Sequence, residues 1–287
     1  MNVFSVHSHK GGVGKTTFSL FLSKYLAQIK KEKTCLIDLD FQAQGLRSTY
    51  LRDNLQYDFS DFLLADEKEK KEIAVAIPVK HQDMDNLYFI ANLFKPGEGI
   101  ETQLDILKKI YIKLVNEIYT GEIMDNLAEL LKHLEKEGFK NIVIDDHPSL
   151  ILLSEEIIKQ VKTVPVFITT PNIVSFVGLF KNIIERADAW KLPLAELKII
   201  FNRVPGKFGL PELLNTIDTF NISSEITPDE KLICSKIKEH FLSGQNGLMF
   251  IEENEKIKGA DTVINPGTLL SLDIPADLKD AAKKICR

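Results

Sequence analysis

The sequence predicts an α/β fold of three layers, with helices flanking a mostly parallel, twisted β-sheet. Short apolar runs of strand length alternate with segments of helical periodicity, and this alternation is typical of parallel βαβ units with right-handed crossovers. The first apolar run leads directly into a glycine-rich loop, as in α/β folds that bind phosphates. At 287 residues and 44% apolar composition, one large domain fits as well as two small ones.

The expected elements follow in order along the chain. A strand over residues 2–6 precedes the loop, and a helix over residues 16–26 follows it. Further apolar runs predict strands at residues 34–39, 87–90, 141–144, 163–168 and 197–201. Apolar residues at helical spacing predict one or two long helices over residues 106–137. We expect a single domain over residues 1–287, of which residues 205–287 carry only short apolar clusters separated by charge.

The glycine-rich loop has the composition of a phosphate-binding loop. Residues 10–17 read Lys-Gly-Gly-Val-Gly-Lys-Thr-Thr, and the glycines let the backbone turn tightly and point its N–H groups at an anion. Lys15 is placed to reach the β- and γ-phosphates of a nucleotide, and the Thr16 hydroxyl to bind Mg²⁺. The alternative is a surface glycine loop that binds nothing. The predicted nucleotide-binding residues of the loop are Gly11, Gly12, Val13, Gly14, Lys15, Thr16 and Thr17.

A second motif is an apolar strand that ends in a carboxylate, Ile-Val-Ile-Asp at residues 142–145. A buried parallel strand delivers its last residue to the sheet edge at which open α/β folds bind ligands. Mg²⁺ prefers oxygen ligands and keeps several of its waters. Asp145 is therefore a candidate for the Mg²⁺ shell, although apolar runs followed by Asp are common.

Lys10 makes the loop distinctive. The form KGGVGKTT resembles the deviant Walker A motif of the ParA/MinD family of P-loop ATPases. The resemblance implies a P-loop NTPase fold with a sheet of about seven to eight strands, with ATP and Mg²⁺ as ligands. It also implies an ATP-dependent homodimer in which Lys10 crosses the interface to the phosphates of the partner's nucleotide. The alternative is a solvated lysine at the edge of the loop.

Two further segments carry the resemblance, which covers roughly residues 1–204. Residues 36–45 resemble the L-x-D-x-D-P-Q-x-N segment of the family, with Phe41 in place of proline. In relatives the second aspartate lies near the attacking water, so Asp40 is a catalytic candidate and Asp38 a metal-side candidate; the alternative is that both cap the sheet edge. Residues 145–149 resemble the D-x-P-P-S switch turn, with His147 replacing the first proline. We expect His147 at the surface.

A further polar residue, Asn202, ends the predicted strand at residues 197–201. Its amide can both donate and accept, so it can pair with the edge of adenine, and many P-loop relatives carry Asn there. A turn-forming asparagine is the alternative.

Three functions compete within this family. The first is a ParA-like ATPase that binds DNA nonspecifically as an ATP-bound dimer and is stimulated by a ParB-like adaptor, its hydrolysis being slow without that adaptor. The second is a MinD-like ATPase that binds membrane through a C-terminal amphipathic helix. The third is a metabolic relative, namely an ATP-dependent ligase, a metal pump or a reductase component.

The C-terminal residues distinguish the first two functions. In a helix over residues 277–287 the basic side chains share one stripe, and the opposite stripe has Leu278, Ala282 and Ile285. That apolar face is too small for an interfacial membrane helix, so we do not expect membrane binding. An ordinary helix packed on the domain is the alternative. The candidate DNA contacts are Arg203, Lys207, Lys279, Lys283 and Arg287.

Composition excludes other classes. The three cysteines, Cys35, Cys234 and Cys286, lie far apart, which argues against a zinc or iron–sulfur site and fits a reducing cytoplasm. The net charge of −5 argues against DNA binding by bulk attraction but not against a local basic patch. No run approaches the ~18–20 apolar residues of a membrane span, and the first strand begins too early for a signal peptide. We therefore expect a cytoplasmic protein, associated with the nucleoid if it binds DNA.

Overall fold

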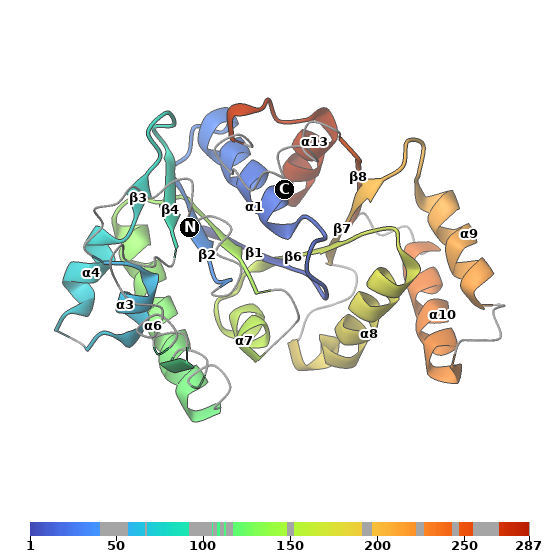
Figure 1. Ribbon diagram of the computed structural model, residues 1–287, viewed down its shortest axis with the longest axis horizontal. Coiled ribbons are helices and arrows are strands. Elements are labelled where there is room, and N and C mark those ends of the chain that lie inside the picture. Colours follow the sequence, from blue (N-terminus) through green and yellow to red (C-terminus); the bar gives the residue numbers. More distant parts are fainter. Residues whose placement is uncertain are drawn as a thin grey trace.

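The computed structural model confirms the predicted α/β fold (Figure 1). It describes residues 1–40, 57–66, 68–91, 105, 108–109, 112, 117–147, 152–190, 197–221, 227–242, 247–254 and 270–286. Over these residues the strands form one eight-stranded sheet in the order β3-β4-β2-β5-β1-β6-β7-β8. Only the β3–β4 pair is antiparallel among the recorded pairings. The first strand lies inside the sheet, between β5 and β6.

The strands are β1 Asn2–His7, β2 Thr34–Asp38, β3 Val79–Lys80, β4 Leu87–Ile90, β5 Asn141–Asp145, β6 Val164–Thr169, β7 Lys198–Val204 and β8 Leu248–Glu252. Six of them fall where apolar runs predict them, because strands buried on both faces are nearly continuous hydrophobic segments. The sequence analysis missed β3 and β8. The first is only two residues long, and the second alternates buried with half-buried side chains in a region rich in charge.

The helices are α1 Lys15–Lys24, α3 Phe59–Leu64, α4 Lys70–Ala76, α6 Glu117–Lys136, α7 Leu152–Gln160, α8 Ile173–Trp190, α9 Leu210–Asn221, α10 Pro228–Leu242 and α13 Ala276–Ile285. A π-helical turn, η1 at Tyr25–Ile29, continues α1. The predicted helix at residues 16–26 therefore runs three residues further. Of the helix predicted at residues 106–137, the part from Glu117 is described as α6.

Helices cover both faces of the sheet (Figure 1). One face carries α1 and α13, and the other carries α6, α7 and α8, with α9 and α10 beyond α8. The core is divided accordingly. One apolar cluster lies under α1 and α13, and two more lie on the opposite face, below β2–β5 and below β6–β7. The sheet is thus enclosed over its central strands, and its carboxyl ends are positioned at one edge for ligand binding.

The C-terminal helix is part of this core. Leu278, Ala281, Ala282 and Ile285 of α13 are buried and belong to the cluster that contains α1 side chains. The segment that enters α13 is held by Lys24 of α1, whose ammonium donates to the carbonyls of Leu270 and Leu272 at 2.6 and 2.5 Å. The apolar stripe of the helix is therefore used inside the protein, as the ordinary-helix alternative expects.

Among the helices that the structure describes, none is both long and apolar enough to cross a membrane.

Candidate nucleotide-binding site

The loop between β1 and α1 has the backbone geometry of an anion-binding loop. Gly12 and Gly14 adopt left-handed conformations, with φ of 76° and 89°, which residues with a side chain rarely adopt. Gly14 is the N-cap of α1, so the loop ends where the unpaired N–H groups of the first helical turn point outward. This places the predicted loop residues at the carboxyl end of the central strand β1.

The lysine of the loop is buried on a carboxylate. Lys15 Nζ donates to Asp145 Oδ1 at 2.7 Å, and Ser19 Oγ of α1 donates to the same oxygen at 3.0 Å. Burial alone would lower the pKa of the Lys15 ammonium, but the adjacent Asp145 carboxylate outweighs it and raises that pKa above its ordinary value. The loop and β5 are therefore joined by a buried ion pair.

Sheet register brings a second carboxylate to the same place. β2 and β5 pair in parallel with Asp38 opposite Asp145. Burial, followed by the charge of Asp145, raises the pKa of the Asp38 carboxyl to about 7. The backbone N–H of Asp40 donates to Asp38 Oδ1 at 2.9 Å, so the chain turns back over Asp38 as it leaves β2. The structure thus brings Asp38 and Asp145 together beside Lys15, with the backbone of Asp40 hydrogen-bonded to Asp38.

These residues fit a magnesium ion. Asp145 Oδ2 is buried and has no hydrogen-bond partner within the described residues, and an unpaired buried carboxylate oxygen is costly unless a cation or donor reaches it. Mg²⁺ is usually held by one or two carboxylates, with waters and substrate phosphates completing the shell. No cage of three or more acidic, His or Cys side chains occurs in the described ranges, and such a site does not need one. Thr16 is the second residue of α1, directly after Lys15.

A further buried carboxylate, Asp146, is held by His7, which was not among the expected site residues. His7 Nδ1, at the end of β1, donates to Asp146 Oδ2 at 2.8 Å, and Ser154 Oγ donates to the same oxygen. On the other side of the ring, His7 Nε2 lies 2.7 Å from Ser5 Oγ. Burial alone would raise the pKa of Asp146, but the hydrogen bonds from His7 and Ser154 lower it below its ordinary value. The residue after Asp145 is therefore fixed to β1 and α7.

The expectation that His147 lies at the surface is wrong. The residue is half-buried, and both of its ring nitrogens are buried without a hydrogen-bond partner in the described part of the chain. The neighbouring Asp146 is fully enclosed, so the chain that leaves β5 stays inside the protein for two residues rather than turning outward at once.

Asn202 meets the phosphate loop directly. Its Nδ2 donates to the carbonyl of Val13 at 2.9 Å, and a Cβ added to Gly14 would lie only 2.2 Å from that nitrogen. Glycine is thus needed at position 14 for two reasons, the left-handed backbone and this close approach. The described structure uses one donor of the Asn202 amide for the loop.

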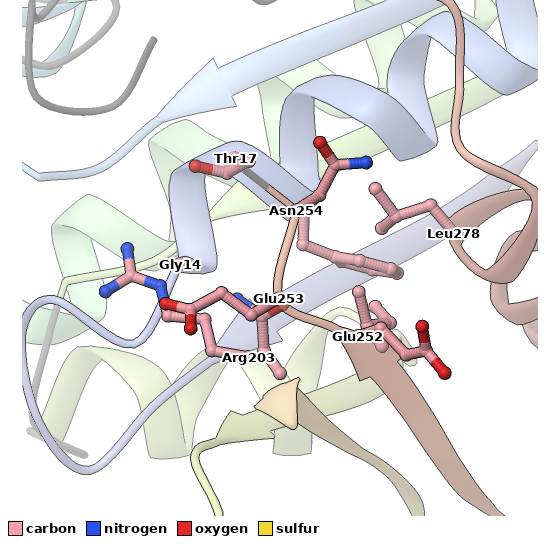
Figure 2. Close-up of a pocket in the computed structure, with 10 residues that line it drawn as sticks. Gly14, Thr17, Arg203, Glu252, Glu253, Asn254 and Leu278 are labelled. Carbon is pink, nitrogen blue, oxygen red and sulfur yellow. The ribbon is translucent and has the colours of Figure 1, made fainter. Parts of the chain in front are cut away.

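A pocket opens beside this contact (Figure 2). Its wall includes Gly14, Thr17 and Asn202 from the loop side, residues 251–254 from the end of β8, and Leu278 of α13. Arg203 also lines it, in a left-handed conformation (φ 58°) where β7 shifts register against β8. Irregularities of this kind re-aim a side chain. The arrangement places a pocket next to the phosphate loop.

The other basic candidates come from separate elements. Lys207 is exposed in the turn between β7 and α9, while Lys279 and Lys283 lie on α13, where Lys283 pairs with Asp280. Arg287, Phe41 and the proline of the switch turn lie outside the described residues.

His9 is a second residue that the sequence analysis did not single out. Counted back from Lys15, it stands at the first position of the pattern G-x-x-x-x-G-K-T, which calls for glycine. An imidazole at a glycine position is the signal that could have found it. The next residue, Lys10, is exposed.

Comparison with known families identifies the family to which the chain belongs. A family model described as an AAA domain matches residues 1–189, and the chain belongs to this family. The septum site-determining protein MinD of Thermotoga maritima is 29% identical over 160 residues, covering 54% of this chain and 53% of that protein. A ParA family protein of Chlamydia muridarum is 28% identical over 155 residues, covering 54% and 53%. The chain is thus a member of the ParA/MinD family of P-loop ATPases, although it spans only about half the length of these two relatives.

Solved structures show the same fold. A candidate plasmid partition protein of Borrelia burgdorferi B31, bound to AMPPNP, superposes with a TM-score of 0.63 at 18% identity, covering 99% of this chain and 96% of that one. MinD of Pyrococcus horikoshii OT3, complexed with Mg-ADP, superposes with a TM-score of 0.56 at 18% identity, covering 99% and 93%.

The raised pKa of Asp38 predicts a pH-dependent stability. The carboxyl ionises near 3.8 when unfolded and at about 7 in the native protein, so the folded state holds an extra proton between these values and loses stability as pH rises through that window. Asp38→Asn removes this penalty. Without Mg²⁺ and nucleotide, its thermal midpoint should exceed that of the native chain at pH 8, and the difference should shrink at pH 5.

Asp83→Asn, at an exposed site, controls for the loss of one charge at the surface. A midpoint difference for Asp38→Asn that does not change between pH 5 and pH 8 would contradict the assignment.

Proposed function

We propose that the chain is a ParA-like ATPase that forms an ATP-sandwich dimer and drives the partition or positioning of DNA or another large cargo. The observation that carries this proposal is the contrast between the two lysines of the loop. Lys15 is buried on Asp145 inside its own subunit, whereas Lys10, five residues earlier, is exposed and has no ion pair within the described residues. An exposed cation on a phosphate loop is free to serve a nucleotide held by a second subunit.

The nucleotide would lie along the loop and the adjoining pocket. The N–H groups of residues 11–17 would hold its phosphates, and Asn202 and the pocket of Figure 2 its base and ribose. Thr16 and Asp145 would ligate Mg²⁺, with Asp38 beside them. Bound there, the metal ion supplies positive charge to the phosphates and to the buried carboxylates.

The Lys15 ammonium cannot pair fully with both the Asp145 carboxylate and the nucleotide phosphates. To reach the phosphates, its ammonium must leave a carboxylate at 2.7 Å, and Asp145 and Asp38 are then both buried without that charge. Isolated buried carboxylates are strongly unfavourable. We therefore infer that Lys15 exchanges partners only when a metal ion reaches Asp145, so that nucleotide and Mg²⁺ bind together.

We propose that the ATP-bound dimer binds nonspecific DNA rather than a membrane. The apolar stripe of α13 is buried against α1, and a membrane-binding helix needs that face exposed. Of the basic side chains of α13, Lys283 and Lys284 are exposed and Lys279 is half-buried. A ParB-like adaptor that stimulates hydrolysis belongs to the same proposal. Iron–sulfur chemistry is disfavoured because the three cysteines lie on separate elements, with Cys35 on β2, Cys234 on α10 and Cys286 at the end of α13.

Replacing Lys10 tests the dimer. Lys10→Ala and Lys10→Gln should leave ADP binding to the monomer nearly unchanged but abolish ATP-dependent dimerisation, because Lys10 has no charged partner in its own described subunit. Lys15→Ala is the matched variant in the same loop, and it should lose nucleotide binding itself. Nucleotide affinity by fluorescence and dimer mass by light scattering separate the two effects. An unchanged ATP-dependent dimer in Lys10→Ala would overturn the sandwich.

Asp40 is the proposed residue for positioning the attacking water. It is buried directly after β2, beside Asp38. Asp40→Ala should bind ATP and dimerise yet hydrolyse it at least about 100-fold more slowly, which would trap the dimer. Phosphate release measured beside dimer mass checks this. If Asp40→Ala hydrolysed ATP at the native rate, another residue would have to position the attacking water.

DNA binding should depend strongly on salt. With four to six phosphates neutralised by two subunits, affinity should fall about 100-fold or more between roughly 50 and 200 mM salt. Because Arg203 lines the pocket, the variant to use neutralises Lys207, Lys279, Lys283 and Arg287 and retains Arg203. It should weaken the ATP-dependent mobility shift without changing ATP hydrolysis. If the native chain gives no ATP-dependent mobility shift of DNA at low salt, the proposal that the dimer binds DNA is wrong.

A further inference from the structure

His9 connects the start of the phosphate loop to α8. Its Nδ1 lies 2.8 Å from Asn182 Nδ2, and the second N–H of that amide donates to the carbonyl of Gly178 at 2.9 Å. An amide nitrogen only donates, so His9 Nδ1 is the acceptor. With both donors used, the orientation of the Asn182 amide is determined by this contact.

The absence of a side chain at Gly178 leaves room for the ring of His9. A Cβ at this position would lie 2.7 Å from both Cδ2 and Nε2 of the imidazole, so the ring lies directly against the helix backbone. Glycine inside a helix costs stability relative to alanine, and Gly178 is in the interior of α8. The close approach of His9 supplies a reason for a glycine at a place where helix propensity disfavours it.

The helix that receives His9 is well anchored. Phe176, Leu179, Phe180 and Ile183 of α8 are buried, each 2% exposed or less, and Phe180 packs edge-on against Phe241 of α10. A side chain attached to α8 is therefore attached to the core of the domain.

Lys10 follows immediately and lies in the unsupported part of the loop. Lys10, Gly11 and Gly12 are exposed, and open space surrounds the Cα atoms of both glycines. The next fixed point is Val13, which is buried and whose carbonyl accepts from Asn202. His9 and Val13 are thus the two points between which the exposed span of Lys10 is held.

We propose that His9, seated on Gly178 and hydrogen-bonded to Asn182, is a positioning residue that holds Lys10 ready to reach the nucleotide of a partner subunit. This inference rests on the proposed function, since it needs an ATP-dependent dimer. It makes α8 the element that fixes the start of the exposed span that carries Lys10, through a contact made by the first residue of the phosphate-loop pattern.

The contact can be removed from the side of α8, without changing a residue of the phosphate loop. Gly178→Ala improves helix propensity and should displace the flexible His9 ring, while Gly121→Ala in α6, where nothing lies within 4 Å of an added Cβ, is the matched control. Gly178→Ala, Asn182→Ala and His9→Ala should each weaken the ATP-dependent dimer at least about fivefold, the factor for one hydrogen bond, with ADP affinity within about twofold of native. Gly121→Ala should dimerise normally.

Two comparisons separate positioning from a general loss of structure. In a double-mutant cycle on dimer dissociation, His9→Ala with Asn182→Ala should be no worse than either alone, whereas additive losses would overturn the contact. His9→Asn keeps an acceptor at the position of Nδ1 and should recover part of the dimer lost in His9→Ala. If the native chain dimerises with ATP and all three variants do so equally well, the inference fails alone. If the native chain does not dimerise, the proposed function fails as well.

Discussion

The buried ion pair between Lys15 and Asp145 is the interaction on which the site depends. It joins the phosphate loop to β5 at 2.7 Å, and it exists because β1 lies between β5 and β6, so that the loop opens over the end of its neighbour. Burying two charges is favourable only when each has a partner. Every change of partner at this site must therefore bring one positive charge as another leaves, and this constraint couples phosphate, metal ion and lysine.

The same constraint explains the neighbouring residues. Asp38, Asp145 and Asp146 are three buried carboxylates at adjoining strand ends. Lys15 donates a hydrogen bond to Asp145, and His7 and Ser154 donate hydrogen bonds to Asp146. At Asp38, burial and the charge of Asp145 outweigh the backbone N–H of Asp40 and the charge of Lys15, so that the pKa of this carboxyl rises to about 7. The excess of buried negative charge at these strand ends would favour a cation there.

The sequence predicts the parts of this arrangement that repeat or that have a fixed spacing. Buried parallel strands appear as apolar runs, and the two motifs that follow or end such strands indicate that the phosphate loop and Asp145 lie at the same sheet edge. The ion pair between Lys15 and Asp145 was not predicted. The roles of His7 and Asn182 cannot be recognised from the sequence, because a single polar residue carries no periodicity and its partner lies 139 or 173 positions away. His9 is marked only by its place at a glycine position, which does not reveal its partner on α8. His147 was misplaced for a similar reason: burial after a strand end depends on packing that no local pattern records. β3, at two residues, is too short to be recognised.

The central claim is that Lys15 is held on Asp145 until a metal ion replaces it. Titration calorimetry of ADP in EDTA, comparing the native chain with Asp145→Asn, tests this most directly, because the variant releases Lys15 without adding a metal. The account predicts that Asp145→Asn binds ADP at least about tenfold more tightly than the native chain in EDTA, and that Mg²⁺ improves the affinity of the native chain far more than that of the variant. Equal or weaker ADP binding by Asp145→Asn in EDTA would contradict it.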